Sequence, residues 1–206
     1  DVDRLTKQAL EDGDEALEIM DAGLIDGMGN VGIKYREAMI FVPEVLACAL
    51  AMKAGMKYIE PILSESGVEP IAKVLMGTVK GDLHDIGKNL CIMMLRGSGF
   101  EVVDLGVDTS DDEFIDAIEE HQATILGMSA LLTTTMPNMG KTIEAMIDAD
   151  VRDDVMVMVG GAPVTQEFAD DMGADGYGKD ALSCVSLAKK LAAEASAART
   201  TKISVE

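Results

Sequence analysis

The pattern of apolar residues changes once along the chain, near residue 70, and this change constrains the fold more than any other feature. Before it, apolar side chains recur at helical spacing from residue 3 to about residue 64. After it, short apolar runs of the kind that form buried strands alternate with helix-like segments. The stretch between them, Ser64–Pro70, is polar and contains Gly and Pro, which is typical of a linker. We therefore expect two domains, 1–66 and 71–206.

The first domain is expected to be entirely helical. Its periodicity is broken near Glu11–Gly13, Gly27–Gly32 and Phe41–Pro43, which predicts about four helices. Pro43 suits the first turn of a helix, because the N–H that proline lacks has no helical partner there. Helices of this length and spacing pack together as a four-helix bundle.

The second domain is expected to be an α/β fold. Its strand-like runs are Ile71–Val79, Phe100–Leu105, Thr124–Ser129, Val155–Val159 and Ala174–Tyr177. Its helix-like segments are 88–97, 111–121, 136–149, 165–172 and 180–194. Alternating apolar strands and helices predict a doubly wound parallel sheet of the Rossmann or flavodoxin-like type, with helices on both faces. In the strand order 2-1-3-4-5, a crevice opens at the carboxyl ends of the first and third strands, where such folds bind ligands.

Composition excludes several classes of partner. The net charge of −20 repels nucleic acid and anionic lipid surfaces, so neither is expected to bind. No apolar segment reaches the roughly 18 residues of a transmembrane helix, and no secretory leader is visible. Cys48, Cys91 and Cys184 are widely separated, which indicates reduced thiols in a cytoplasmic protein.

His84 is the best candidate for the chemistry of the chain. It lies in the segment Gly81–Gly87, which follows the first predicted strand and therefore borders the crevice. Asp82 can reach one imidazole nitrogen and fix the tautomer of the ring. The only other histidine, His121, falls at the end of a helix-like segment and is expected to be solvated.

A zinc site is not expected at His84, because zinc needs three or four protein ligands and the crevice loops offer no second His or Cys. A metal bound there would need a cofactor that supplies the remaining ligands. Two other interpretations stay open at this point: a general base oriented by Asp82, and a loop histidine satisfied by hydrogen bonds. A receiver domain would need an acidic cluster after the first strand, and a flavin site would favour aromatic residues, which make up only 3% of the chain. Glycines at the strand ends, including Gly160-Gly161, suggest a slot for a bulky group.

Three short motifs resemble the signature of cobalamin-binding domains. They are Asp82-x-His84-x-x-Gly87, Ser129-x-Leu131 and Gly160-Gly161, in this order at successive strand ends. The preceding helices resemble the cap domain of methionine synthase and of the small corrinoid proteins of methylotrophic methyl transfer. The segments 77–82 and 131–137 are especially similar to the latter group.

The resemblance implies a corrinoid bound base-off, with His84 as the lower axial ligand of cobalt in place of the cofactor's own dimethylbenzimidazole. Asp82 would hydrogen-bond His84, and Thr135 would continue this relay where methionine synthase has serine. The displaced nucleotide tail would enter the slot between the sheet and the helices. The residues implied for this slot are Gly87, Ser129, Leu131, Thr133, Gly160 and Gly161.

In the cap, the resemblance implies that Tyr35, Val42 and Val45 cover the upper face of the cobalt. An apolar lid of this kind would exclude water from the metal. For Val42 and Val45, packing inside the helical bundle is the alternative. The linker Ser64–Pro70 is the expected hinge on which the cap moves aside.

The implied function is a methyl shuttle. Co(I) would accept a methyl group from a substrate:corrinoid methyltransferase, methyl-Co(III) would pass it to a second, corrinoid:acceptor methyltransferase, and a reductive activator protein would restore Co(I). With 206 residues, the chain has no room for a catalytic barrel, so we expect a non-catalytic subunit of a multi-component system. The alternatives are the cobalamin-binding subunit of a mutase and a corrinoid-based sensor domain. The sequence leaves open the donor (methanol, methylamine, betaine or a methoxy compound) and the acceptor.

Overall fold

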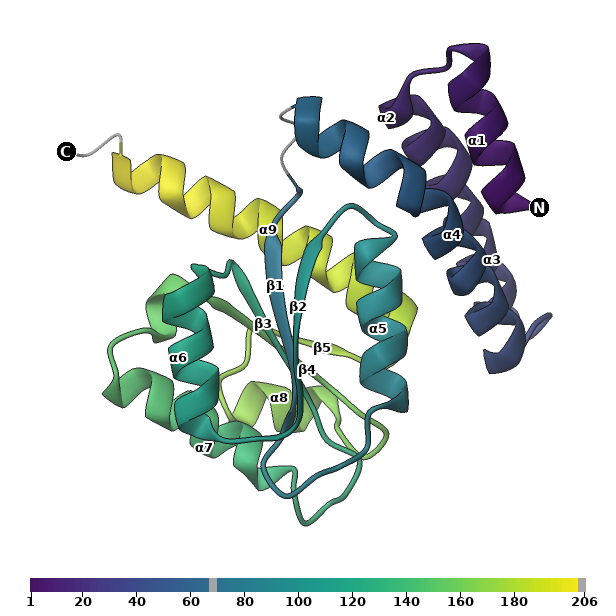
Figure 1. Cartoon of the computed structure of the whole chain (residues 1–206). Coiled ribbons are helices and arrows are strands. Elements are labelled where there is room, and N and C mark those ends of the chain that lie inside the picture. The colour runs from purple at the N-terminus through teal and green to yellow at the C-terminus, as the bar shows by residue number, and fades with distance from the viewer. Residues whose placement is uncertain (67–69, 204–206) are drawn as a thin grey trace. The chain divides into compact units, whose positions relative to one another are not determined.

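The computed structural model describes residues 1–66 and 70–203 (Figure 1). The chain divides into two compact units. One comprises Asp1–Pro70 with Gly97–Gly99, and the other comprises Ile71–Arg96 with Phe100–Glu206. Of the expected linker, residues 67–69 lie outside the described part of the chain. No helix within the described residues is long and apolar enough to cross a membrane.

The first unit is helical, as expected. Its elements are α1 (Val2–Asp12), α2 (Ala16–Glu18), the π-helical η1 (Ile19–Ile25), α3 (Asp26–Arg36) and α4 (Val42–Ser66). The predicted breaks near Gly13 and Phe41 are confirmed: Gly13 ends α1 with a φ of 95°, and α4 begins directly after Phe41. Pro43 lies in the first turn of α4, where its missing N–H costs nothing.

The break predicted at Gly27–Gly32 is wrong, because these glycines lie inside α3. Elements α2, η1 and α3 follow one another without a gap, so residues 16–36 form one helical stretch. Along it Met20, Leu24 and Met28 are buried at intervals of four residues. A glycine costs a helix only about 1 kcal/mol relative to alanine, and this continuous apolar face offsets that cost.

The second unit is a parallel sheet of five strands. They are β1 (Lys73–Val79), β2 (Glu101–Thr109), β3 (Ile125–Ser129), β4 (Met156–Gly160) and β5 (Gly176–Gly178). Their order is β2-β1-β3-β4-β5, which confirms the predicted winding. The reversal of direction between β1 and β3 places the loops after these two strands side by side at the carboxyl edge of the sheet.

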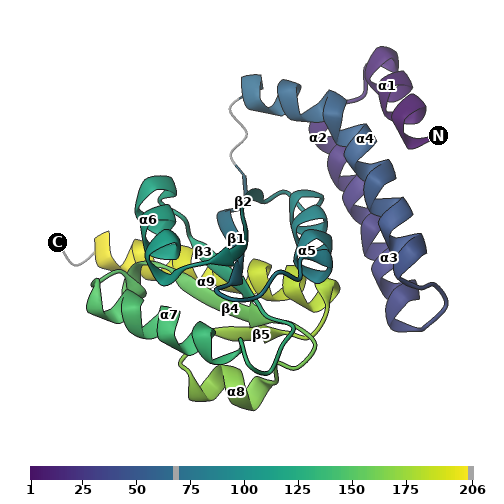
Figure 2. The ribbon, with the colours of Figure 1, turned by 60° about the horizontal axis from the view of Figure 1, so that its bottom comes forward.

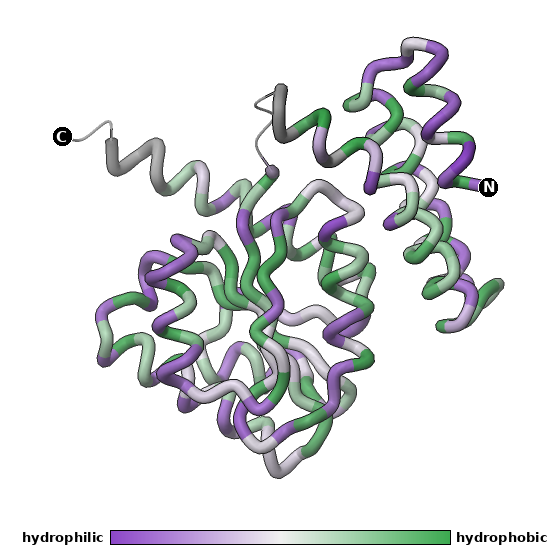
Figure 3. Tube along the Cα trace, in the orientation of Figure 1, coloured by the Kyte–Doolittle hydropathy of each residue, from purple (hydrophilic) through white to green (hydrophobic). Residues whose placement is uncertain are grey.

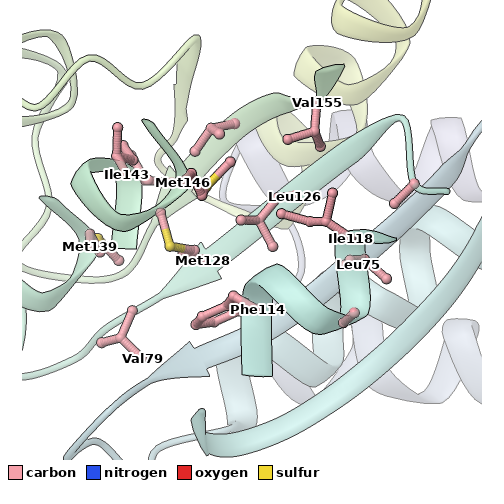
Figure 4. Close-up of a cluster of buried hydrophobic side chains, with 14 of the residues drawn as sticks. Leu75, Val79, Phe114, Ile118, Leu126, Met128, Met139, Ile143, Met146 and Val155 are labelled. Atoms are coloured by element: carbon pink, nitrogen blue, oxygen red, sulfur yellow. The ribbon is translucent and has the colours of Figure 1, made fainter. Parts of the chain in front are cut away.

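Helices cover both faces of this sheet (Figure 2). They are α5 (Ile86–Arg96), α6 (Asp111–His121), α7 (Pro137–Asp148), α8 (Gln166–Asp171) and α9 (Ala181–Ile203), with the short 3-10 helix η2 (Arg152–Asp154) before β4. On one face α6, α7 and α8 pack around Phe114 and Met139 (Figure 4). On the other face α5 and α9 pack around Leu95 and Leu191. Helix α9 extends well beyond the predicted end at residue 194.

The hydropathy of the chain follows these layers (Figure 3). The central strands β1, β3 and β4 are buried almost throughout, as expected for parallel strands with helices on both faces. The edge strand β2 is more exposed, and only two of its nine residues are buried. The covering helices carry polar residues on their outer sides and apolar residues toward the sheet.

Strand β2 is longer than the predicted run 100–105, because its pairing with β1 shifts twice. The paired residues are Met76 with Asp104, Gly77 with Gly106, and Val79 with Thr109. Each shift inserts one extra residue in β2, as a β-bulge does. Gly106 and Asp108 are residue types that disfavour strands, so the end of this strand was predicted too early.

The packing of β1 against α6 predicts that Gly77→Ala destabilises the protein. A Cβ at Gly77 would lie 2.5 Å from Cε1 of Phe114, which is fully buried and cannot move aside. We expect a loss of about 1–3 kcal/mol in the free energy of unfolding, measured by urea denaturation. Gly140→Ala is the control, because a Cβ there meets only Met172 at 3.7 Å. Equal stability of the two variants would contradict this account of the core.

Candidate functional site

The candidate site lies at the carboxyl ends of the strands, where the sequence predicts a crevice. The loop between β1 and α5 carries Asp82 and His84, and Gly81 turns it with a φ of 82°. The neighbouring loop after β3 begins at Ser129, which pairs with Thr78 of β1 on one side and Gly160 of β4 on the other. The structure therefore brings together the three motifs that are separated in the sequence.

Asp82 is completely buried and joins the two loops. Its Oδ1 accepts hydrogen bonds from the backbone N–H of His84 at 3.1 Å and from His84 Nδ1 at 2.7 Å. Its Oδ2 accepts from the backbone N–H groups of Leu131 at 2.8 Å and Leu132 at 3.2 Å, and from the hydroxyl of Thr135 at 2.6 Å. The predicted sequence of contacts Thr135, Asp82, His84 is present in the structure.

The charge state of Asp82 follows from these partners. Burial alone would raise the pKa of its carboxyl group, but the hydrogen bonds from Thr135, Leu131 and His84 outweigh burial and hold the pKa well below its usual range. An ionised carboxylate only accepts hydrogen bonds, so His84 Nδ1 must carry the proton of the Nδ1···Oδ1 bond. This assigns the tautomer and leaves the lone pair of Nε2 available to a metal.

The surroundings of His84 are apolar yet exposed. Its own side chain is 49% exposed. Leu83 and Ile86, in the same loop and at the start of α5, are 70% and 75% exposed, and Leu131 and Leu132 are also exposed. Large apolar side chains left uncovered in two adjoining loops are typical of a surface that receives an apolar ligand. Sequence analysis missed Leu83, Ile86 and Leu132, although apolar residues inside a loop between strand and helix were a visible signal.

The glycines of the site have two different surroundings. A Cβ at Gly161 would overlap the carbonyl oxygen of Ala130, and one at Gly160 would lie 2.8 Å from the carbonyl oxygen of Gly178. These two glycines are therefore required by the protein's own backbone. At Gly87, in the first turn of α5, no atom lies within 4 Å of the position of a Cβ, so space is open beside it.

The remaining predicted residues are distributed as follows. Ser129 is half-buried at the end of β3, Thr133 is exposed and Thr135 is buried. Tyr35, Val42 and Val45 belong to the first unit, where Val45 lies in the bundle core and Val42 is exposed. Their role above the metal stays a prediction. His121 is half-buried at the last residue of α6, the helix end where it was expected.

The donor set fits a corrinoid better than a free metal ion. Within the described residues, no three side chains of His, Cys, Asp or Glu gather to hold a metal ion. Cys48, Cys91 and Cys184 are free thiols. His84 can therefore contribute one imidazole ligand, and the other ligands must come with the metal. A corrinoid would bring the remaining ligands of its cobalt with it, and the exposed side chains of Leu83 and Ile86 would offer it an apolar surface.

The relay predicts the effect of removing one hydroxyl group. Thr135→Val keeps the shape of the side chain but removes a hydrogen bond to a buried carboxylate. We expect it to lower the free energy of unfolding of the cofactor-free protein by about 1.5–3 kcal/mol, as for hydrogen bonds to charged groups. Urea denaturation measures this loss.

The matched control is Thr135→Ser, which keeps the hydroxyl and loses one methyl group. We expect it to cost about 0.8 kcal/mol, the value for one buried methylene. A serine variant as unstable as the valine variant would show that packing, and not the hydrogen bond, holds this position.

Comparisons with known proteins lead to cobalamin-binding domains. Two family models described as B12 binding domains match the chain, one over residues 72–186 and the other over residues 1–60. Trimethylamine corrinoid protein 2 of Methanosarcina mazei is 41% identical over 187 residues, which cover 90% of this chain and 86% of that protein. Dimethylamine corrinoid protein 1 of Methanosarcina acetivorans is 41% identical over 177 residues, covering 85% of this chain and 83% of that protein.

Solved structures lead to the same group. A cobalamin-binding protein from Desulfitobacterium hafniense superimposes with a TM-score of 0.79 at 30% identity, covering 91% of this chain and 89% of that one. The methanol:cobalamin methyltransferase complex of Methanosarcina barkeri gives a TM-score of 0.77 at 32% identity, covering 91% of this chain and 71% of that one. The chain therefore belongs to the family of corrinoid proteins with a B12-binding domain.

Proposed function

We propose that this protein carries a methyl group on a bound corrinoid from a substrate:corrinoid methyltransferase to a corrinoid:acceptor methyltransferase. The observation that carries the proposal is the hydrogen-bonded series Thr135, Asp82, His84, which ends on an exposed imidazole with a free Nε2. Relatives named trimethylamine and dimethylamine corrinoid proteins support it, as does similarity to a methanol:cobalamin methyltransferase complex. The bound corrinoid would supply a cobalt that accepts and releases the methyl group.

In this proposal His84 ligates the lower face of the cobalt through Nε2, and the corrinoid is bound base-off. The buried carboxylate of Asp82 holds the imidazole in one tautomer and raises the basicity of Nε2. The Thr135 hydroxyl donates to the other carboxylate oxygen of Asp82, Oδ2, and so holds the carboxylate in the orientation that faces His84.

The displaced nucleotide tail is proposed to run past Gly87 and along Ser129, Leu131 and Thr133. The open space at Gly87 supports this path. Gly160 and Gly161 keep the backbone compact beside it. Residues 1–66 are the proposed cap, in which Tyr35, Val42 and Val45 would cover the upper face, and residues 71–206 form the proposed cobalamin domain.

The partners follow from the same proposal. Methylamines are the first donors to test, because several relatives at 41% identity are named for trimethylamine or dimethylamine. A reductive activator protein is a third proposed partner, since a corrinoid that carries methyl groups must be restored after accidental oxidation. The free thiols of Cys48, Cys91 and Cys184 support a reducing compartment such as the cytoplasm.

Axial ligation is tested with cobalamin-reconstituted protein and two histidine variants. In the wild type, the absorption and EPR spectra of the cob(II)alamin form are expected to show base-off cofactor with one protein nitrogen on cobalt. His84→Ala should abolish the nitrogen coupling because it removes that ligand. His121→Ala is the matched control at the far end of α6 and should leave both spectra unchanged. Unaltered spectra in His84→Ala would refute the ligand assignment.

Methyl transfer is tested with reduced, cobalamin-loaded protein and a trimethylamine:corrinoid methyltransferase. Radiolabelled methyl groups are expected to become bound to the protein only when amine, methyltransferase and loaded protein are all present. Label should then pass to a thiol acceptor after addition of a corrinoid:thiol methyltransferase. Tight cobalamin binding without any labelling by methylamine, methanol or betaine systems would argue against a methyl carrier and favour a mutase subunit or a sensor.

A further inference from the structure

We propose that two aspartates of β2, Asp104 in its middle and Asp108 near its carboxyl end, position the His84 loop from both of its ends and so set how strongly His84 ligates cobalt. This inference rests on the proposed function. It assigns a role to an edge strand that contributes none of the residues of the three cobalamin motifs. Both aspartates act through the loop and do not touch the cofactor.

The two bulges of β2 create this arrangement. A regular β2 would pair residue for residue with β1. The actual β2 has two extra residues, and its end is hydrogen-bonded to the loop that follows β1. Gly106 takes a φ of 83° and Asp108 a φ of 55°, backbone conformations that redirect the strand at these two points. Bulges commonly re-aim side chains beside functional sites.

Asp108 holds the start of the loop through two reciprocal hydrogen bonds. Its Oδ1 accepts from the backbone N–H of Gly81 at 2.6 Å, and its own backbone N–H donates to the carbonyl oxygen of Asp82 at 3.0 Å. The second bond fixes the main chain of the residue whose carboxylate orients the imidazole. Asp82 is thus held by its side chain to the loop after β3 and by its main chain to β2.

Asp104 holds the end of the loop through an ion pair with Lys88, in the first turn of α5. Lys88 is 2% exposed, so its ammonium group depends on this partner and on Asn89 Oδ1 at 3.2 Å. Asp104 Oδ1 also accepts from the N–H of Gly106 inside the bulge. Since a buried charge is costly without a partner, this pair fixes α5 to β2 directly after the loop.

The consequence concerns the geometry of ligation. Between these two fastenings lie Leu83, His84, Asp85 and Ile86, all exposed. His84 itself is held by Asp82 and by the Thr78 hydroxyl, which donates to the carbonyl oxygen of His84 at 3.1 Å, and the two fastenings hold the ends of the segment around it. Because both ends of the loop are fixed, the loop already holds His84 in position before cobalt binds. Binding cobalt therefore does not have to order the loop.

The test compares Asp108→Gly with Asp108→Asn. Glycine removes the acceptor yet tolerates a positive φ, and asparagine keeps an Oδ1 acceptor and also tolerates this conformation. In cob(II)alamin-loaded protein, EPR nitrogen coupling measures the ratio of histidine-on to histidine-off cobalt. We expect Asp108→Gly to lower this ratio about tenfold, the size of one hydrogen bond to a charged group, and Asp108→Asn to stay within about threefold of wild type. In cofactor-free protein, amide exchange in peptides spanning residues 80–88 should accelerate in the glycine variant.

The matched control is Asp150→Gly. Asp150 also has a positive φ, 61°, but it precedes β4 and so lies at the amino ends of the strands, away from the site. A double variant, Lys88→Met with Asp104→Asn, tests the Lys88–Asp104 ion pair without leaving a buried charge unpaired. Its control is a second double variant, Lys73→Met with Glu101→Gln. The control pair is a more exposed salt bridge, which joins the first residue of β1 to the first residue of β2 and does not touch α5. The first double variant should lower the ligation ratio and the second should not.

The outcomes separate this inference from the proposed function. No nitrogen coupling in the wild type would refute the ligation of cobalt by His84, on which this inference rests, and the labelling experiment tests methyl transfer separately. Normal coupling in the wild type, with an unchanged ratio in both Asp108→Gly and the Lys88/Asp104 double variant, would overturn the positioning role alone. A ratio in Asp108→Asn as low as that in Asp108→Gly would also contradict it, because the acceptor is retained there. Lowered ratios with unchanged cobalamin affinity would support it.

Discussion

The site depends on one buried negative charge. Asp82 is removed from solvent, and its carboxylate accepts five hydrogen bonds from His84, Leu131, Leu132 and Thr135. Burial of an unpaired carboxylate would be costly, so the loops after β1 and β3 are stable only in the arrangement that supplies these donors. One interaction therefore fixes the relative position of two loops and the tautomer of the imidazole, and it connects the sheet topology to metal chemistry.

The topology itself was predictable because each strand was coded locally. Continuous apolar runs marked β1, β3 and β4. Their alternation with helical segments predicted a doubly wound sheet, for which 2-1-3-4-5 is a common strand order. The errors arose where packing overrides propensity. The glycines of α3 are kept helical by the buried face that includes Met28, and β2 continues past Gly106 because of its bulges. The four-residue spacing of Met20, Leu24 and Met28 is visible in a window of sequence and was outweighed by the glycines, whereas the register shifts of β2 are not visible there.

The site was predictable in part for a different reason. Asp82 and His84 are two residues apart, so their contact is local, and Thr135 came from the resemblance. The backbone donors Leu131 and Leu132 have no side-chain signature, and the bonds from Asp108 and Asp104 depend on register shifts. Gly160 and Gly161 were expected to border a ligand slot, which stays a prediction, and nothing in the sequence indicated that a Cβ at either would also meet the main chain of Gly178 or Ala130.

The full set of hydrogen bonds on the Asp82 carboxylate has a consequence for the folding of the cofactor-free chain. Within the described residues, every buried side-chain nitrogen and oxygen has a hydrogen-bond partner supplied by the protein. In zinc fingers and many other small metal-binding domains, folding and metal binding are one event, because the buried ligands need the metal. Here the buried polar groups around His84 find all their partners within the polypeptide. The loops of the site can therefore take up this arrangement before any cofactor is bound.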